Sequence, residues 1–304
     1  MTISQKRIRR ITENYVLYLF LLPCLLYFII FHYGPMYGIQ IAFKDFIASR
    51  GITGSPWAGF KHFERFFKSY LFWTLIRNTL AISIYRLAAS FPIPIILALM
   101  INQHQSVGFK KTVQLVTYAP HFISMVVLVG MINIFFSIRT GLVNMALKGM
   151  GFEAISFLSE PGWFRDLFVW SAVWQNAGWS TIIYLASLAS IDPQLHEAAI
   201  VDGASRIQRI WHIDLPGILP TIMILLILNL GRVMNVGFQK AYLMQNALNL
   251  ETSEVIATYV YKVGLLNAQF SFSAAVGVFN AVINLVLLLS VNKIAKVAGQ
   301  SSLW

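Results

Sequence analysis

Six long apolar segments follow one another along the chain, and the segments between them hold nearly all of the charged residues. A membrane-spanning helix needs about 20 mainly apolar residues, and only a helix satisfies its own backbone hydrogen bonds within lipid. All 12 aspartates and glutamates lie outside these segments. The pattern therefore predicts an all-α membrane protein with six transmembrane helices, at roughly 15–34, 78–101, 112–136, 167–190, 217–238 and 272–292.

Three prolines within the predicted spans suggest kinks. Pro92 and Pro94 lie in the second span, and Pro120 lies in the third. Each proline removes a backbone donor from the helix that contains it. We expect kinks at these positions.

Composition supports a membrane protein and excludes several other classes. The chain is 57% hydrophobic and 12% charged, whereas soluble domains carry about 25% charged residues. The net charge is +11, but the basic residues form no stripe interleaved with aromatics, so we expect no nucleic acid as partner. The single cysteine, Cys24, can form no internal disulfide. The basic residues suit contact with membrane lipid.

The basic residues also predict an orientation. Lys6, Arg7, Arg9 and Arg10 precede the first span, and cytoplasmic segments of membrane proteins are enriched in lysine and arginine. The run 15–33 is long enough to span, and no cleavage site for a signal peptidase follows it. An even number of spans then places both termini in the cytoplasm. We divide the chain into a basic segment at 1–14, a transmembrane domain at 15–292 and a tail at 293–304.

Two connecting segments carry further patterns. Aromatic and charged residues alternate within 35–77, which is typical of an amphipathic helix lying in the membrane interface. His62 belongs to this stretch and is expected to be solvated. The glycine-rich segment 139–166 is predicted to be an external loop with short interfacial pieces.

The segment 191–216, between the fourth and fifth predicted spans, has mixed charge and a helical period. Gly203 is expected to break the helix, and Pro216 to end the segment. The pattern predicts a short helix, a glycine-centred turn and a second helix on the membrane surface. Such an element can dock into a groove of another protein.

The same segment contains a specific motif. Glu197-Ala198-Ala199 is followed by three residues and Gly203, and after nine more residues by Ile213-x-Leu215-Pro216. This arrangement resembles the EAA motif of ABC importer permeases. Further similarity to the LplB-like branch of the maltose-type carbohydrate permeases lies at Asn78-Thr79-Leu80, Phe91-Pro92-x-Pro94-Ile95, Trp179 to Tyr184, Ile191-Asp192-Pro193 and Gly237-Phe238.

The resemblance implies a type I importer permease with a MetI-like fold and no enzymatic activity of its own. In such permeases, the EAA loop is cytoplasmic and forms coupling helices that sit in a cleft of the ATPase subunit. In this chain the loop spans 191–216, and its coupling residues would be Glu197, Ala198, Ala199, Asp202, Gly203, Ile213, Leu215 and Pro216.

The resemblance also implies cofactors and partners. ATP and magnesium would be bound by the partner ATPase and none by this chain, which contains no GxxxxGK[ST] motif. The implied partners are two ATP-binding cassette subunits, an extracellular binding protein and a second, similar permease in a heterodimer, although self-pairing stays open. The implied location is a bacterial inner membrane. The substrate would be a sugar or oligosaccharide, with alginate-like, xylan-derived and pectin-derived oligomers all open.

Polar residues within the predicted spans are candidates for the substrate pathway, because such residues mark pathways or helix contacts. Sugar recognition needs hydrogen-bonding groups and aromatic faces. Arg232, Asn235 and Gln239 would share one face of the fifth span, and Arg86 is expected to snorkel or to have a structural partner. The candidates are Trp174, Asn176, Trp179, Tyr184, Asn229, Arg232, Asn235, Asn280 and Asn284. The alternative for each residue is an interhelical hydrogen bond.

Two other classes of membrane protein compete with this interpretation. Ion-coupled secondary carriers often keep acidic residues at mid-membrane and show inverted repeats, and neither feature is visible here. A membrane enzyme would require converging nucleophilic, acidic or metal-binding residues, and the histidines show no such spacing. An ion-coupled carrier for a polar solute stays the alternative function.

Overall fold

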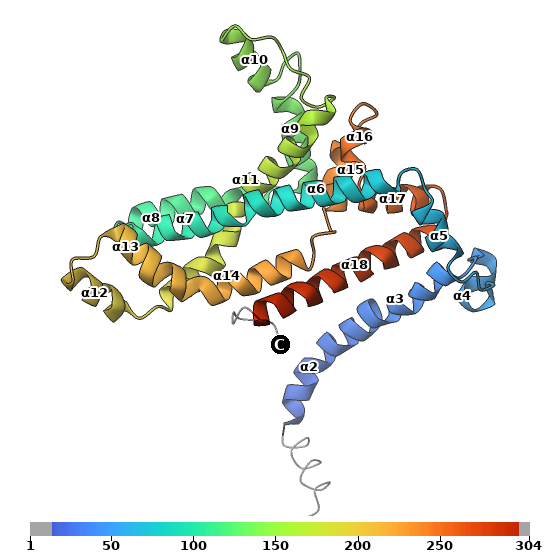
Figure 1. Ribbon diagram of the computed structural model, residues 1–304, viewed down its shortest axis with the longest axis horizontal. Coiled ribbons are helices and arrows are strands. Elements are labelled where there is room, and N and C mark those ends of the chain that lie inside the picture. The colour runs from blue at the N-terminus through green and yellow to red at the C-terminus, as the bar shows by residue number, and fades with distance from the viewer. Residues whose placement is uncertain (1–13, 298–304) are drawn as a thin grey trace, which may run out of the picture. The chain divides into compact units, whose positions relative to one another are not determined.

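Helices form throughout the part of the chain that the computed structural model describes, residues 14–297, and no strand occurs within that range (Figure 1). These residues divide into two compact units. The first unit contains 14–67 and 263–278, and the second contains 68–262 and 279–297. The predicted basic segment with Lys6, Arg7, Arg9 and Arg10 lies outside the described residues, as does most of the predicted tail.

The first unit begins with α2 (Tyr15–Phe28). The helix continues through a π-helical turn at Ile29–Tyr33, α3 (Gly34–Met36) and a 3-10 turn at Tyr37–Phe43. Together they form an apolar run of 29 residues, and no residue of α2 is buried. A helix that is apolar on every side and has no buried residue is suited to lipid as its solvent.

A short helix forms where aromatic and charged residues alternate, as the amphipathic pattern predicted, and it buries His62 and Phe66. It is one of several short elements within 35–77. The segment folds into a 3-10 turn at Ala48–Arg50, α4 (Gly51–Gly54) and α5 (Lys61–Phe67). Gly51 and Gly59 have φ of 65° and 59°, a conformation that glycine adopts at no steric cost and that interrupts a helix.

The prediction that His62 is solvated is wrong, because its side chain is buried against Asp45. Nε2 of His62 lies 3.1 Å from the Asp45 carboxylate, and His62 is 8% exposed. Lys61 forms an ion pair of 2.9 Å with the same carboxylate, and this hydrogen bond lowers the pKa of Asp45. Both basic residues therefore hold α5 to the preceding loop.

The first unit also contains the start of α18 (Phe270–Val297). The Phe46 amide donates to Oγ of Ser271 over 2.8 Å. Phe66 and Phe272 are buried, and the guanidinium of Arg65 lies 4.5 Å from the centre of the Phe272 ring. Apolar burial and a cation–π contact thus join segments that are some 200 residues apart in sequence.

The second unit begins with α6 (Phe72–Ser90) and α7 (Pro92–Gln103), which are separated only at Phe91. Together they form an apolar run of 32 residues. At the first of the predicted kinks, Pro92, the helix is interrupted, since α7 begins at that residue. Proline is favoured at the first position of a helix, where its missing N–H leaves no partner unsatisfied.

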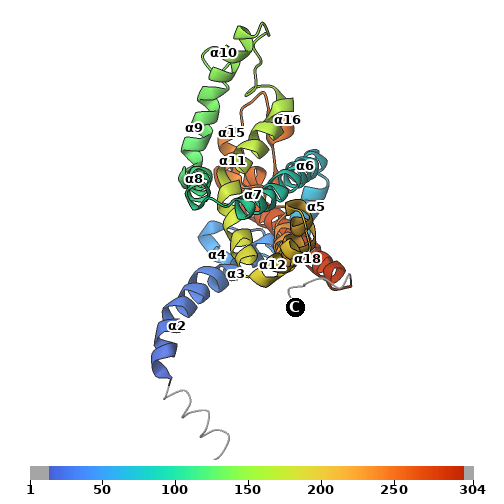
Figure 2. The same cartoon turned by 90° about the vertical axis from the view of Figure 1, so that its left-hand side faces the viewer.

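The sequence pattern predicted a single helix over 112–136, but the structure divides this segment. The parts are α8 (Val107–Tyr118), a 3-10 turn at Ala119–Phe122 that contains Pro120, and α9 (Met125–Phe135). The two parts meet at an angle of 99°. Oγ of Ser124 accepts a hydrogen bond from the Val127 amide and so caps the new helix. In both views α9 leads away to α10 (Leu142–Gly149) (Figures 1 and 2).

The long helix α11 (Pro161–Ala189) runs through the second unit and contacts α6, α7, α8, α14, α15 and α16 (Figure 1). Its 29 residues extend over about 43 Å. The predicted start at 167 is wrong, because the helix begins at Pro161 and includes Arg165 and Asp166. Arg165 donates to Oδ1 of Asn78 over 3.1 Å, and Asp166 accepts from the Tyr85 hydroxyl over 2.6 Å.

Gly178 marks the closest approach of α11 to α8. A Cβ atom added at Gly178 would collide with the backbone carbonyl of Thr117. Small residues at such crossings allow two helix backbones to pack closely. The crossing therefore depends on the absence of a side chain at this position.

The fifth apolar segment forms α13 (Arg206–Arg209), a π-helical turn at Ile210–Asp214 and α14 (Leu215–Leu230). The prediction of a helix up to 238 is wrong, because turns follow Leu230 and Gly237 has φ of 100°. Arg232, Asn235 and Gln239 therefore do not share one helical face. The chain continues through α15 (Phe238–Met244), α16 (Leu250–Ser253), α17 (Ile256–Tyr261) and a π-helical turn at Lys262–Leu266.

Among the described residues, four helices are long and apolar enough to cross a membrane: Tyr15–Phe43, Phe72–Gln103, Arg206–Leu230 and Phe270–Val297. The bent pair of α8 and α9 makes a fifth if it forms one span. The 29-residue α11 has the length but carries Arg165, Asp166, Gln175 and Asn176. The chain thus has an all-helical membrane fold, and the six predicted crossings stay a prediction.

Candidate functional site

The segment that carries the EAA-like motif folds into two short helices. α12 (Pro193–Val201) is capped by Asp192, whose carboxylate accepts from the Gln194 amide over 3.0 Å. Gly203 has φ of 79°, and Ser205 and Gln208 then form a capping box at the start of α13. The predicted helix, glycine-centred turn and second helix are confirmed as local structure. The prediction that Pro216 ends this segment is wrong, because one helical run continues from Arg206 to Leu230.

Most motif residues lie on the surface of this helix pair. Glu197, Ala198, Asp202, Gly203 and Pro216 are exposed, while Ala199, Ile213 and Leu215 are partly buried. Large apolar side chains are exposed beside them, namely Leu195, Ile200, Val201, Ile207 and Trp211. An apolar exposed surface of this kind on a short helix pair is suited to contact with another protein.

A buried carboxylate that the sequence analysis missed ties α12 to two other helices. Asp214 is 0% exposed and accepts a hydrogen bond of 2.7 Å from Nε2 of Gln103, the last residue of α7. Its other oxygen lies 3.2 Å from Nε2 of His196 on α12. A Cβ at Gly217 would approach the Ile191 side chain to 2.6 Å. These contacts place α12 against the start of α14.

Four of the nine candidate pathway residues lie together in one cavity. Its volume is about 500 Å³, and it lies between α6, α11 and α14. Asn176, Trp179 and Tyr184 of α11 and Asn229 of α14 line it. Cavities of this size suit small-molecule ligands, and the aromatic and amide groups suit a sugar.

The other five candidates lie outside this cavity. Trp174 lines a separate, apolar cavity of about 420 Å³, and Arg232 is exposed in a turn. Oδ1 of Asn235 accepts from Asn280 over 3.2 Å and from Asn284 over 3.5 Å. These three asparagines join the turn after α14 to α18. A hydrogen bond between helical elements was the alternative to a pathway role for each of them.

Arg86 of α6 also lines the cavity, although it was not among the pathway candidates. Its guanidinium donates to the carbonyl oxygens of Val236 over 2.9 Å and Asn235 over 3.3 Å. The structural partner expected for Arg86 is thus main-chain carbonyls about 150 residues away in sequence, a distance that no local pattern reveals.

His121, in the bend between α8 and α9, was likewise missed. Its ring stacks on Trp179 with centroids 4.5 Å apart and an angle of 4° between the planes. Nδ1 of His121 lies 3.1 Å from Oδ1 of Asn176, while Nδ2 of Asn176 donates to the Ala172 carbonyl. The bend in 112–136 therefore supports the wall of the cavity.

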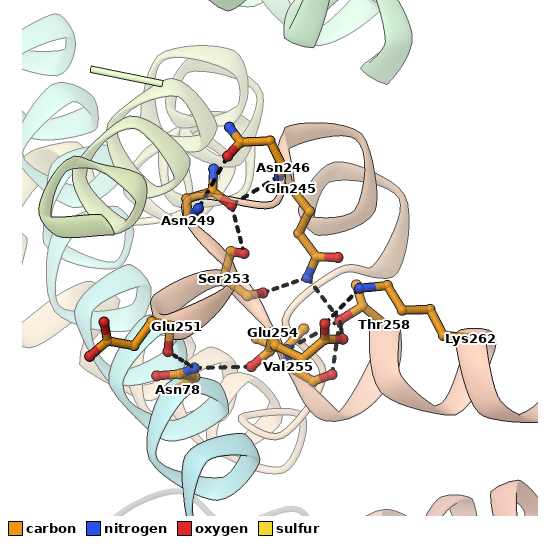
Figure 3. Close-up of polar contacts among 10 residues, drawn as sticks. All are labelled: Asn78, Gln245, Asn246, Asn249, Glu251, Ser253, Glu254, Val255, Thr258 and Lys262. Atoms are coloured by element: carbon orange, nitrogen blue, oxygen red, sulfur yellow. Dashed lines mark hydrogen bonds and ion pairs between the residues drawn. The ribbon is translucent and has the colours of Figure 1, made fainter. Parts of the chain in front are cut away.

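A polar network lies at the opposite end of α11 from α12, where α6 meets the segment 245–262 (Figure 3). Nδ2 of the fully buried Asn78 donates to the carbonyls of Glu251 over 2.8 Å and Glu254 over 3.1 Å. The Glu254 carboxylate accepts from Thr258 over 2.9 Å and forms an ion pair of 2.6 Å with Lys262. These contacts fix the loop helices against α6.

We predict that replacing Asn78 by leucine destabilises the protein by about 2–4 kcal/mol, because two buried carbonyls and the Arg165 guanidinium would lose their partner. Thermal unfolding of the detergent-solubilised protein measures the effect. Asn133→Leu, the same change at an exposed residue of α9, serves as the control. Equal unfolding temperatures for the two variants would contradict the prediction.

No group of three or more histidine, cysteine, aspartate or glutamate side chains within 14–297 could hold a metal ion. The polar groups of the site are instead amides, hydroxyls, aromatic rings and one guanidinium. Such groups can bind a polar solute, and they include no activated nucleophile.

Comparisons with known proteins agree with this geometry. The polygalacturonan/rhamnogalacturonan transport system permease protein YteP of Bacillus subtilis is 46% identical over 98% of this chain and 92% of that protein. Protein LplB of the same organism is 44% identical over 95% of this chain and 91% of its own length.

A solved structure shares the fold as well. It is a bacterial alginate ABC transporter in complex with an alginate pentasaccharide-bound periplasmic protein. One chain of that complex matches with a TM-score of 0.89 and 42% identity, covering 97% of this chain and 99% of that chain. The family model for binding-protein-dependent transport system inner membrane components matches residues 90–297. The chain belongs to this family of inner membrane transport components.

Proposed function

We propose that this chain is a permease subunit of an ATP-driven ABC importer that takes up an oligosaccharide. The observation that carries the proposal is the likeness, along nearly the whole chain, to permeases of sugar importers. A second, similar permease would complete the pathway, and an extracellular binding protein would deliver the sugar. Six crossings with both termini in the cytoplasm complete this proposal.

In this proposal α12 and α13 are the coupling element that meets an ATPase subunit. The exposed Glu197 and the exposed apolar side chains around it support such a contact. ATP and magnesium would bind to two ATPase subunits and not to this chain. Closure of the ATPases would then move α12, and with it the helices to which Asp214 is bonded.

The relatives favour some substrates over others. YteP is named for polygalacturonan and rhamnogalacturonan, and the solved complex imports alginate. Pectin-derived and alginate-like oligomers are therefore better supported than xylan-derived ones. An ion-coupled carrier, the alternative function, has no support from the family match.

The test is uptake by the complete importer reconstituted in vesicles with its binding protein. We expect oligosaccharide uptake and binding-protein-stimulated ATP hydrolysis, and both should persist when ionophores collapse the ion gradients. Removal of ATP, or its replacement by a non-hydrolysable analogue, should stop uptake. Uptake that follows an ion gradient and ignores ATP would contradict the proposal.

A further inference from the structure

The Arg86 guanidinium is held in place at the cavity but its charge is not neutralised there. Its two hydrogen-bond partners are the carbonyl oxygens of Val236 and Asn235, which accept hydrogen bonds without carrying a full negative charge. No carboxylate lies within ion-pair distance of Arg86 among the residues that the structure describes. Charged side chains within membrane proteins pair or face a polar cavity, and Arg86 lines one.

A second basic residue, Lys240, lies near Arg86, and burial lowers its pKa to about 7. Lys240 is 4% exposed, donates to the Phe168 carbonyl over 2.7 Å and lies 4.8 Å from the centre of the Phe168 ring. The charges of Lys240 and Arg86 repel each other enough to contribute to a lower pKa for Lys240, after burial as the larger cause. The fixed positive charge at this cavity is therefore that of Arg86, which lines it.

The rest of the cavity wall is neutral. Its polar lining comes from serine hydroxyls, the amides of Asn176 and Asn229 and the Tyr184 hydroxyl, and none of its lining residues is acidic. Asp166, the acidic residue of α11, accepts from the Tyr85 hydroxyl and lines the apolar cavity instead. An anion in the cavity would thus meet one fixed positive charge and no negative one.

The wall also offers a flat ring. Trp179 lines the cavity with 44% of its surface exposed, and His121 stacks on it. Because Nδ2 of Asn176 donates to Ala172, Oδ1 of Asn176 is an acceptor, so His121 donates from Nδ1. These contacts hold both Trp179 and Asn176. A ring fixed in this way can stack against the apolar face of a pyranose.

We propose that the cavity contains a binding site for a uronate residue, with Arg86 binding the sugar carboxylate and Trp179 stacking on the ring. This inference rests on the proposed transport of an oligosaccharide and adds the side chains of this chain that would recognise a uronate. An arginine can form two parallel hydrogen bonds to a carboxylate, and such charge-assisted bonds are among the stronger ones in proteins.

The test compares two probes that differ only in charge, tri-galacturonate and its neutral methyl ester. Binding is measured on the nanodisc-embedded importer without its binding protein, so that the selectivity of that protein does not enter. We expect the unmodified importer to prefer the acid, and added salt to weaken binding of the acid but not of the ester.

Two substitutions separate charge from stacking. Arg86→Gln keeps hydrogen-bond donors for the carbonyls and should weaken binding of tri-galacturonate at least about tenfold, with little effect on the ester. Arg86→Lys should restore most of the affinity for the acid. Trp179→Leu should weaken both probes by similar factors, because stacking does not depend on the charge of the sugar.

Equal binding of acid and ester by the unmodified importer would overturn the inference. An equal loss of affinity for both probes in Arg86→Gln would overturn it too. Absence of tri-galacturonate binding up to about 10 mM would overturn it as well. Failure of the proposed function is a different result, in which the importer with its binding protein takes up neither acidic nor neutral oligosaccharides.

Discussion

Replacing Glu197 by lysine is expected to reduce ATP-driven uptake to the background level while the protein still inserts and assembles. Glu197 is exposed on α12, so the substitution removes no internal contact. It inverts the charge of the surface that we propose for the ATPase contact, and a like-charge juxtaposition at an interface costs several kcal/mol. Uptake by vesicles and binding-protein-stimulated ATP hydrolysis measure the effect.

Glu153→Lys is the matched control, because Glu153 is also exposed and undergoes the same change of charge away from α12. It should leave uptake within about twofold of the unmodified importer. A shared loss in both variants would mean that net charge matters and the position on α12 does not. Undiminished uptake in Glu197→Lys would count against α12 as the coupling element.

Gly203 provides an independent probe of the same element, because its φ of 79° is unfavourable for most side chains. No atom lies within 4 Å of a Cβ built there, so a substitution acts through the backbone alone. Valine should disturb the turn at a cost of about 1–2 kcal/mol and lower uptake, whereas asparagine tolerates this conformation and should be close to normal.

Replacing Gly178 by alanine is expected to destabilise the folded protein by roughly 3 kcal/mol or more. The added methyl group would collide with the Thr117 backbone, which cannot move aside as a flexible side chain could. Either α8 or α11 would have to shift. The unfolding temperature of the solubilised protein should fall by roughly 5 to 10 °C.

The control for Gly178 lies on the same helix. Gly162→Ala adds the same methyl group to α11 where no atom lies within 4 Å of the new Cβ. Its unfolding temperature should match that of the unmodified protein. Similar losses in both variants would indicate a general intolerance of α11 to alanine, and the close helix crossing would then be unimportant.

Local signals predicted the coupling segment well. Gly203 breaks the helix where the pattern placed the break, and the start of α7 at Pro92 follows the rule for proline at a first helical turn. These features depend on neighbours within a few residues, so the sequence contains the information. The apolar runs similarly predicted helices, because lipid leaves the backbone few alternatives.

Hydropathy alone could not predict where the chain changes direction. Apolar residues continue from α8 into α9, and nothing in their composition indicates a bend of 99°. Pro120 suggested a kink, and Ser124 just before an apolar run was an N-cap signal that could have indicated a second helix. The extension of the fifth span past Leu230 ignored Gly231 and Gly237, which are common at helix ends.

The cavity shows the limit of sequence reasoning most clearly. Asn176, Trp179, Tyr184 and Asn229 were found because their polar or aromatic character is unusual within apolar runs. Arg86 was not placed at the cavity, and His121 was missed, because their roles depend on partners that folding brings near. Arg86 contacts carbonyls 149 and 150 residues away, and His121 contacts Asn176, 55 residues away.

The buried Asp214 carboxylate connects α7, α12 and the start of α14 within the second unit. Asp214 accepts a hydrogen bond from the last residue of α7 and faces His196 of α12. A displacement of α12 would therefore be transmitted to α7 and α14. Pro94 of α7 and Asn229 of α14 both line the cavity. In the proposed importer, a displacement of α12 would therefore move Pro94 and Asn229, on two different helices of the cavity wall, together.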